Sequence, residues 1–224
     1  MDMNAAKQLL RTTVGDHRVR RLKAARLRFA ERLGIHSWSR PALNDLDARL
    51  LDLVRDEPPG AFIEFGANDG LQQSNTYALE RELGWRGLLI EAVPQLAAEC
   101  ARNRPLANVA CATISSVDHE GELIGVVDSD LFGRVGTTRV AAAATTISRA
   151  IDTLPNKSAE LVCIDVEGYE LQALQGLDLT RHRPRYLLIE TSQVDRVHEA
   201  LSPHYGPPIR WSYHDHLFVT DAPL

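Results

Sequence analysis

Short apolar runs alternate with amphipathic segments along most of the chain. The runs are rich in branched aliphatic and aromatic residues, which is typical of buried strands. They predict strands over residues 62–65, 88–90, 109–114, 161–164, 186–189, 209–213 and 217–220. The segments between them predict helices over residues 46–54, 77–83, 94–102, 146–154, 170–174 and 194–201. This alternation predicts an α/β fold with a mostly parallel sheet, helices on both faces and an antiparallel strand at one edge.

Polar residues before two of the predicted helices are expected to cap them. Asn44 and Asp45 precede the helix at 46–54, and Ser74 precedes the helix at 77–83. Residues 117–146 depart from the regular pattern, with four glycines and several β-branched residues. We expect a hairpin or an insertion on the substrate side there.

The net charge of −5 is unevenly distributed. Residues 1–40 hold ten Lys/Arg and three Asp/Glu, whereas the other 184 residues hold 15 Lys/Arg and 27 Asp/Glu. We therefore predict a basic helical N-terminal extension over residues 1–42 and one domain over residues 43–224. Val19, Leu22, Phe29 and Leu33 fall on one face of the extension, which predicts packing on its own domain or on a second subunit, as in a homodimer. Contact with an anionic membrane or a nucleic acid is the alternative.

The hydrophobicity, charge and cysteine positions of the chain narrow the class of protein. No apolar stretch approaches the length of a membrane span, so we expect no stable membrane insertion and a cytoplasmic location. The acidic main body argues against an enzyme that acts on nucleic acid, because such enzymes usually need a basic face. Cys111 and Cys163 lie in apolar runs and are expected to be buried, reduced thiols.

The most informative motif follows the first predicted strand. It consists of Glu64, Phe65, Gly66, Ala67, Asn68, Asp69 and Gly70, and the next strand ends at Glu91. Glycines at such a turn let the backbone approach a ligand, and an acidic residue at the second strand end can accept hydrogen bonds from ribose hydroxyls. The spacing differs from the dinucleotide fingerprint, and the Asp69 carboxylate would repel a pyrophosphate. The motif therefore favours S-adenosylmethionine over NAD, with a tight turn that binds no ligand as the other reading.

Acidic residues also follow the later strands. Because the carboxyl ends of parallel strands meet at one edge of a sheet, Glu64, Glu91, Asp165 and Glu190 are expected on one rim. Crowded carboxylates raise one another's pKa, so Asp165 is the first candidate to orient or deprotonate an acceptor hydroxyl.

Other acidic and histidine residues near this rim have simpler explanations. A metal bridging Asp165, Glu167 and Glu190 is chemically feasible, but we predict none. Glu170 is expected to complement a helix dipole. In His214-Asp215-His216, we expect a polar turn, with His214 as the second candidate base.

Taken together, these motifs resemble FkbM-type methyltransferases. The resemblance rests on the glycine-containing motif at residues 64–70 and on four further motifs, and it covers about residues 43–220. Those motifs are Ser74-Asn75-Thr76-Tyr77-Ala78-Leu79-Glu80, Gly84-Trp85-Arg86-Gly87, Leu89-Ile90-Glu91 and Asp165-x-Glu167-Gly168-x-Glu170. The resemblance implies a Rossmann-like class I fold, with a seven-stranded sheet whose last strand is antiparallel. It further implies O-methylation of a hydroxyl on a sugar, glycan or polyketide-type natural product.

The resemblance also implies roles for particular residues. Glu64, Gly66, Asn68 and Gly70 would line the methionine end of the cofactor, and Glu91 would hold the ribose. Ala67 and Asp69 complete this predicted cofactor loop. Asp165 and Glu167 occupy the family's acidic motif beside the transfer site, and with His214 they are the predicted catalytic residues. Ala92-Val93-Pro94 departs from the more usual proline directly after the Glu91 position.

Two other functions compete with methyl transfer. An NAD(P)-dependent oxidoreductase would share the strand–loop–helix pattern, but its glycine spacing would differ. A catalytically silent scaffold would recruit partners through residues 1–40.

Overall fold

The computed structural model describes residues 20–35, 39–127 and 139–223 of the chain. By its contacts the chain divides into two units, Met1–Arg40 and Pro41–Leu224. In the first unit, residues 20–32 form a helix. Leu22, Phe29 and Leu33 of the predicted apolar face are 70%, 64% and 61% exposed, and Val19 lies outside the described residues.

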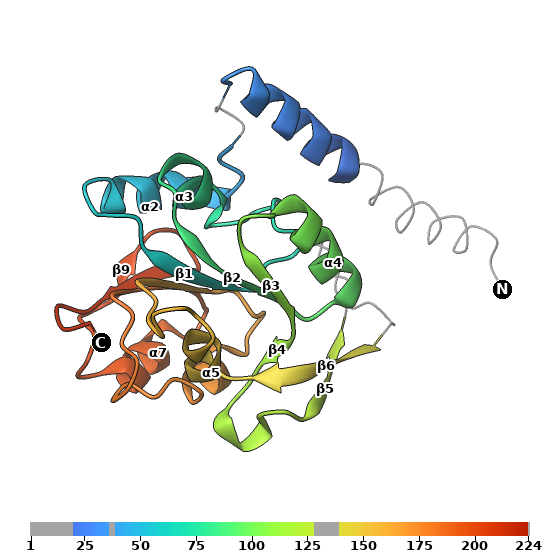
Figure 1. The fold of residues 1–224 in the computed structure, drawn as a ribbon. Coiled ribbons are helices and arrows are strands. Elements are labelled where there is room, and N and C mark those ends of the chain that lie inside the picture. Colours follow the sequence, from blue (N-terminus) through green and yellow to red (C-terminus); the bar gives the residue numbers. More distant parts are fainter. Residues whose placement is uncertain (1–19, 36–38, 128–138, 224) are drawn as a thin grey trace. The chain divides into compact units, whose positions relative to one another are not determined.

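The second unit contains the strands and helices that build an α/β domain (Figure 1). Its strands are β1 (Ala61–Phe65), β2 (Arg86–Glu91), β3 (Asn108–Cys111), β4 (Thr113–Ile114), β5 (Leu123–Val127), β6 (Arg139–Thr145), β7 (Leu161–Ile164), β8 (Tyr186–Glu190), β9 (Ile209–Arg210) and β10 (Asp215–Val219). Its α-helices are α2 (Leu46–Val54), α3 (Tyr77–Glu82), α4 (Pro94–Asn103), α5 (Ile147–Asp152), α6 (Glu170–Leu174) and α7 (Val194–Leu201). Short 3-10 helices cover Leu43–Asp45 (η1) and Val117–His119 (η2).

The main sheet has seven strands in the order β3-β2-β1-β7-β8-β10-β9. Strands β3, β2, β1, β7 and β8 are parallel, and β10 is antiparallel to both β8 and β9. The predicted mostly parallel, seven-stranded sheet with an antiparallel last strand is therefore confirmed. The chain moves outward from β1 to β3 and then returns to β7 on the other side of β1. This reversal creates a switch point between β1 and β7, where ligands of such sheets bind.

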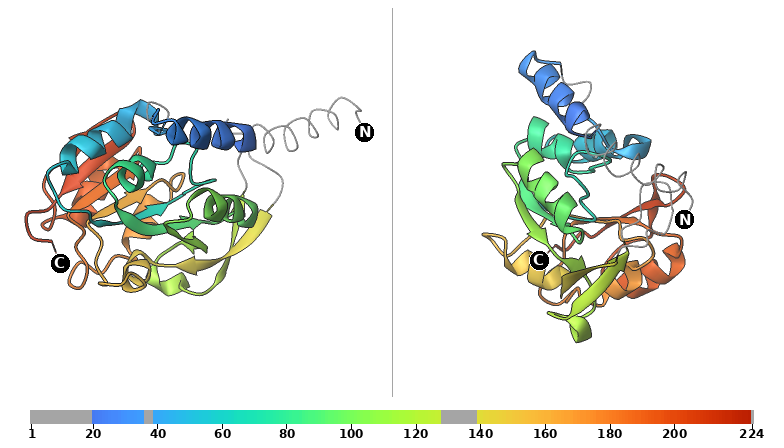
Figure 2. Two further views of the ribbon diagram at one scale, coloured as in Figure 1. Left: turned by 45° about the horizontal axis from the view of Figure 1, so that its top comes forward. Right: turned by 90° about the vertical axis from the view of Figure 1, so that its right-hand side faces the viewer.

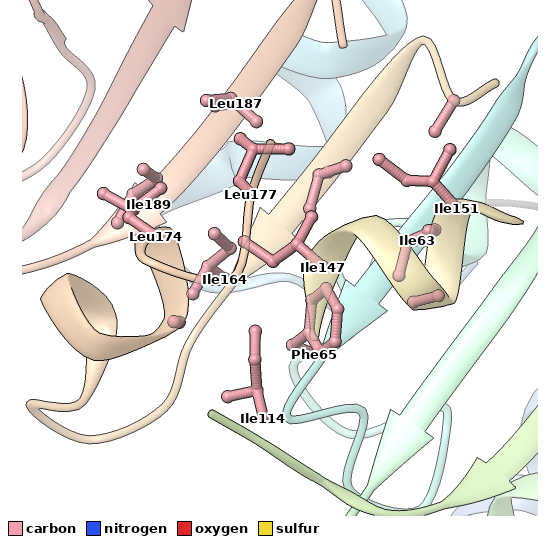
Figure 3. Packing of buried hydrophobic residues seen from close by; sticks show 14 of the residues in the cluster. Ile63, Phe65, Ile114, Ile147, Ile151, Ile164, Leu174, Leu177, Leu187 and Ile189 are labelled. Carbon is pink, nitrogen blue, oxygen red and sulfur yellow. The ribbon is translucent and has the colours of Figure 1, made fainter. Parts of the chain in front are cut away.

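The sheet is buried by helices on both faces, as Figures 1 and 2 show. One core joins alternate strand residues such as Ile63 and Phe65 to Ile147 and Ile151 of α5 and to Leu174 of α6 (Figure 3). The other joins Phe62 and Leu89 to residues of α2, α3 and α4. Side chains along a strand point alternately to the two faces, so continuous apolar runs are what this double burial requires.

Several local predictions differ from the structure. The predicted strand at 109–114 is two strands in different sheets, because β4 pairs with β6 rather than with β2. The predicted strand at 209–213 is only two residues long. The predicted hairpin is present as the antiparallel pair β5 and β6, and its connection at 128–138 lies outside the described residues. Cys163 is buried as predicted, whereas Cys111, on edge strand β3, is exposed.

The two predicted helix caps are wrong. Asn44 and Asp45 adopt positive φ angles and make no side-chain cap to α2. Ser74 also does not cap α3, because its hydroxyl donates to Glu64 on β1 instead. A tertiary hydrogen bond to a buried carboxylate has replaced the local cap.

Candidate functional site

A cavity of about 850 Å³ opens at the carboxyl ends of β1, β2, β7 and β8. All four strand-end carboxylates of the sequence prediction, Glu64, Glu91, Asp165 and Glu190, line it. The other polar and charged residues of its lining are Asn44, Asn68, Gln72, Gln73, Asn75, Thr113, Glu167, Ser212, Tyr213, His214 and Asp215. Among the described residues that line the cavity there is no Lys or Arg, so its surface is strongly electronegative.

The two glycines of the motif are required by contacts with the protein itself. Gly66 has φ +81°, and a Cβ there would lie 2.1 Å from the carbonyl oxygen of Asp165, the residue directly after neighbouring strand β7. Gly70 has φ +78°, and a Cβ there would lie 2.8 Å from Arg104 Cγ and Cys100 Sγ. Both positions exclude a side chain, but close packing, rather than only ligand approach, provides the reason.

The cofactor loop is divided between residues that face the cavity and residues that shape the turn. Gly66 and Asn68 line the cavity, whereas Ala67, Asp69 and Gly70 are not in its lining. The Asp69 carboxylate is buried and accepts from the backbone N–H groups of Leu71 and Gln72 at 3.0 and 2.7 Å. Asp69 therefore stabilises the turn, and its predicted role in cofactor binding stays a prediction.

Glu91 connects the end of β2 to the cofactor loop. One carboxylate oxygen accepts from the Asn68 N–H and the other from the Val93 N–H, each at 2.8 Å. The carboxylate is thus fixed at the cavity wall.

Glu64 lines the cavity, but its carboxylate is already satisfied by the protein. It accepts from the Ser74 hydroxyl at 3.0 Å, from the Asn75 N–H at 2.8 Å and from the Thr76 hydroxyl. Glu64 therefore holds the segment after the loop. Among the described residues, the buried Asn75 side-chain oxygen has no hydrogen-bond partner. The sequence analysis missed Gln72 as a cavity residue, because it belongs to no acidic or glycine-rich pattern, and it named Asn75 only within a family motif, without a role.

A second group of lining residues is a cluster of carboxylates. Asp165 directly follows β7, is partly buried and shares a hydrogen bond with Glu190 at the end of β8. Burial, the charges of Glu190 and Glu167 and this hydrogen bond raise the pKa of Asp165 from 3.8 to about 8. Burial and the neighbouring Asp215 raise the pKa of Glu190 as well. The two carboxyl groups therefore hold a proton between them at neutral pH, because two adjacent negative charges repel each other.

The turn before β10 adds to this group of lining residues. Asp215 is buried and accepts from the Ser212 hydroxyl and from the Asn44 amide at 3.4 Å. Of the predicted polar turn at 214–216, only His214 precedes β10, because Asp215 and His216 begin that strand; the exposed His214 side chain lies in the cavity lining. His216 is buried, and no other histidine lines the cavity among the described residues. Asp215 and Ser212 also line the cavity, whereas the sequence analysis assigned Asp215 only to a turn and Ser212 only to the predicted strand at 209–213.

We also searched the described residues for a metal site. They contain no group of three or more His, Cys, Asp or Glu side chains arranged to hold a metal ion. In particular, Asp165, Glu167 and Glu190 line one cavity without forming such a group, and the absence of a metal stays a prediction.

The geometry can now be compared with known proteins. A family model described as the methyltransferase FkbM domain matches residues 64–218, which begin at Glu64 and contain every predicted site residue. A comparison with curated proteins finds no match.

Solved structures give weaker likenesses. The methyltransferase FkbM from Methylobacillus flagellatus is 18% identical with a TM-score of 0.49, over 72% of this chain and 43% of that one. An RNA methyltransferase from Salinibacter ruber in complex with S-adenosyl-L-homocysteine is 14% identical with a TM-score of 0.45, over 81% and 95%. A precorrin-6y C5,15-methyltransferase from Geobacter metallireducens is 12% identical with a TM-score of 0.45, over 78% and 85%.

The chain therefore spans less than half the length of the Methylobacillus protein. The family assignment rests on the family model, which covers well over half of this chain, and on a sheet order that agrees with the Rossmann-like methyltransferase fold. The chain belongs to the FkbM methyltransferase domain family.

Proposed function

We propose that the protein transfers a methyl group from S-adenosylmethionine to a hydroxyl oxygen of a sugar, glycan or polyketide-type small molecule. The observation that carries this proposal is the cavity at the switch point. It is lined both by Gly66, Asn68 and Glu91 and by the Asp165–Glu190 pair and His214. Membership of a methyltransferase family favours this activity over the oxidoreductase alternative.

The cavity residues fit S-adenosylmethionine in charge and hydrogen bonding. The cofactor carries a sulfonium and an ammonium group, and a lining of carboxylates without Lys or Arg among the described residues favours such cations. Glu91 would accept from the ribose hydroxyls. Gly66 and Asn68 would bound the methionine end, and the unpartnered Asn75 oxygen would accept from the ammonium group.

The proposed reaction needs alignment and removal of one proton. When bound, S-adenosylmethionine supplies a methyl group attached to a positively charged sulfur. The acceptor oxygen forms the new O–C bond as the C–S bond breaks, and the electron pair of that bond stays on the sulfur. The hydroxyl proton passes to Asp165 in its ionised form. The carboxylates and His214 would orient the hydroxyl, so positioning would supply much of the acceleration.

Calorimetric titration with S-adenosylhomocysteine tests the cofactor site without a known acceptor. We expect micromolar binding by the wild type and a loss of at least about tenfold, or 1.4 kcal/mol, in Glu91→Ala. Glu199→Ala, an exposed residue of α7 outside the cavity lining, is the matched control and should bind like the wild type. Absence of binding by the wild type would contradict methyl transfer and favour the scaffold reading.

The acceptor and the partners require their own experiments. A panel of hydroxylated sugars and polyketide-type compounds, assayed for release of S-adenosylhomocysteine, tests the proposed substrate class. Mass spectrometry of the product then distinguishes O-methylation from N- or C-methylation.

Sedimentation of the full chain tests the homodimer expected from the amphipathic extension. Among the described residues, no helix is both long and apolar enough to span a membrane.

A further inference from the structure

Arg104 is a fully buried cation beneath the cofactor loop. It directly follows α4, and its side chain has no exposed surface. An arginine remains charged at all physiological pH values, so burying it costs several kcal/mol unless the protein supplies partners. The identity of those partners therefore indicates what the residue does.

Three of the four side-chain hydrogen bonds of Arg104 go to the segment that follows the cofactor loop. One terminal nitrogen, Nη1, donates to the Gly70 carbonyl at 3.1 Å and to the Ser74 hydroxyl at 3.0 Å. The other, Nη2, donates to the Thr76 hydroxyl at 3.2 Å and to the Glu80 carboxylate at 3.3 Å. The guanidinium group thus joins the glycine turn to the start of α3.

The hydroxyl groups of Ser74 and Thr76 connect Arg104 to Glu64, which lines the cavity. Each hydroxyl has one hydrogen, which Ser74 and Thr76 donate to Glu64 while they accept from Arg104. Glu64 also accepts from the Asn75 N–H. The buried cation and the buried carboxylate are therefore linked through two hydroxyl groups whose direction is fixed by the charges at either end.

Packing fixes Arg104 from its other sides. Its Cγ and the Cys100 sulfur lie where a Gly70 side chain would stand, and neighbouring Asn103 donates to the Asp69 carbonyl at 2.8 Å. The guanidinium carbon lies 5.6 and 5.4 Å from the ring centres of Phe62 and Tyr77. A planar, multiply donating cation suits these surroundings, and a lysine ammonium could not reach the same set of acceptors.

We propose that Arg104 is a positioning residue that sets the cofactor loop for binding. This inference rests on the proposed function, because the loop is the proposed methionine-end site. Arg104 itself does not line the cavity, but Glu64 and Asn75, which its network orders, do. Loss of the network leaves the loop free to move, and the binding conformation is then populated only part of the time.

The decisive variants are Arg104→Lys, which keeps the charge, and Thr76→Val, which keeps the shape and removes one hydroxyl link. Arg102→Gln is the matched control, because Arg102 is an exposed residue in the last turn of the same helix. We expect each of the first two variants to weaken binding of S-adenosylhomocysteine by about tenfold at a temperature where circular dichroism shows full folding. The double variant should lose much less than the product of the two effects, because both break one network.

Hydrogen exchange separates positioning from general stability. In Arg104→Lys, the amides of residues 66–76 should exchange faster, whereas those of β7 and β8 should keep their protection. Variants that bind and exchange like the wild type, or that lose protection evenly across the sheet, would overturn the proposal. If Arg104→Lys does not fold, Thr76→Val decides alone. If the wild type binds no S-adenosylhomocysteine, the proposed function fails, and the exchange comparison still decides the role of Arg104.

Discussion

Replacing Glu190 with glutamine should lower the pKa of Asp165. Burial is the first cause of the rise from 3.8 to about 8, and the charge of Glu190 is the second. The Glu190→Gln variant removes that charge but keeps the burial, so we expect the pKa to fall by at least about one unit, equivalent to 1.36 kcal/mol, and to stay above its ordinary value. At pH 7 the ionised fraction of Asp165 would then rise from about one tenth to about one half.

Carbon-13 NMR of protein labelled at its aspartate carboxyl groups measures this directly. The resonance absent from Asp165→Asn identifies Asp165, and its midpoint is followed from pH 5 to 9.5. A wild-type midpoint near 4, or an unchanged midpoint in Glu190→Gln, would refute the coupled-pair reasoning. If Asp165 is the base, the wild-type rate with both substrates well below KM should rise about tenfold from pH 7 to 9, and Asp165→Asn should abolish that rise.

The raised pKa of Asp165 also makes the free energy of unfolding depend on pH. Between about pH 4 and 8, Asp165 binds a proton in the folded protein but not in the unfolded chain. The free energy of unfolding should therefore receive its full contribution from this group below about pH 4 and lose it as the pH rises towards 8. Urea unfolding of the wild type and of Asp165→Asn across this range checks the direction, because the variant should lack this decrease.

Two further predictions concern the fold. Gly66→Ala should lower the free energy of unfolding by about 2–4 kcal/mol, because the new Cβ meets the Asp165 carbonyl oxygen. Gly84 has a similar φ but open space around it, so Gly84→Ala should lower the free energy of unfolding by only about 1–2 kcal/mol. Equal losses of the two variants in urea unfolding would contradict the steric reason. Ile147→Ala, in the core between α5 and the sheet, should lose about 2–5 kcal/mol, and Leu123→Ala, 76% exposed, should stay within about 0.5 kcal/mol. A small loss at Ile147 in the same unfolding assay would mean that the core relaxes around the deletion.

The main strands were predictable because burial on both faces leaves a simple pattern. Residues 62–65 and 161–164 are nearly continuous apolar runs, and the rule that ligands bind at strand ends placed Asp165 and Glu91 on one rim. The wrong predictions concern polar side chains that can bond either to nearby backbone groups or to residues distant in the sequence. Ser74 has the chemistry of a helix cap, yet its hydroxyl bonds to a carboxylate ten positions earlier.

Arg104 shows why part of the site was unpredictable. In sequence it is one of several arginines near a helix end, and its partners lie 24 to 34 positions away. Only the packing of α4 against the loop brings them together. The bonding of Asp69 was hidden from the sequence in a similar way: its carboxylate accepts from nearby backbone N–H groups of the turn, and its role toward a cofactor stays a prediction.

The position of β10 inside the sheet affects how a nascent chain acquires its site. Strand β10 separates β8 from β9, so β8 has an open edge and β9 has no partner until residues 215–219 have left the ribosome. Asp215, the first residue of β10, also forms part of the cavity wall. Strands β1, β2 and β7 can pair earlier during synthesis, but the part of the cavity wall that contains Asp215 is completed only when β10 inserts. Until β10 inserts, the open edge of β8 presents unpaired backbone groups with which another strand can pair.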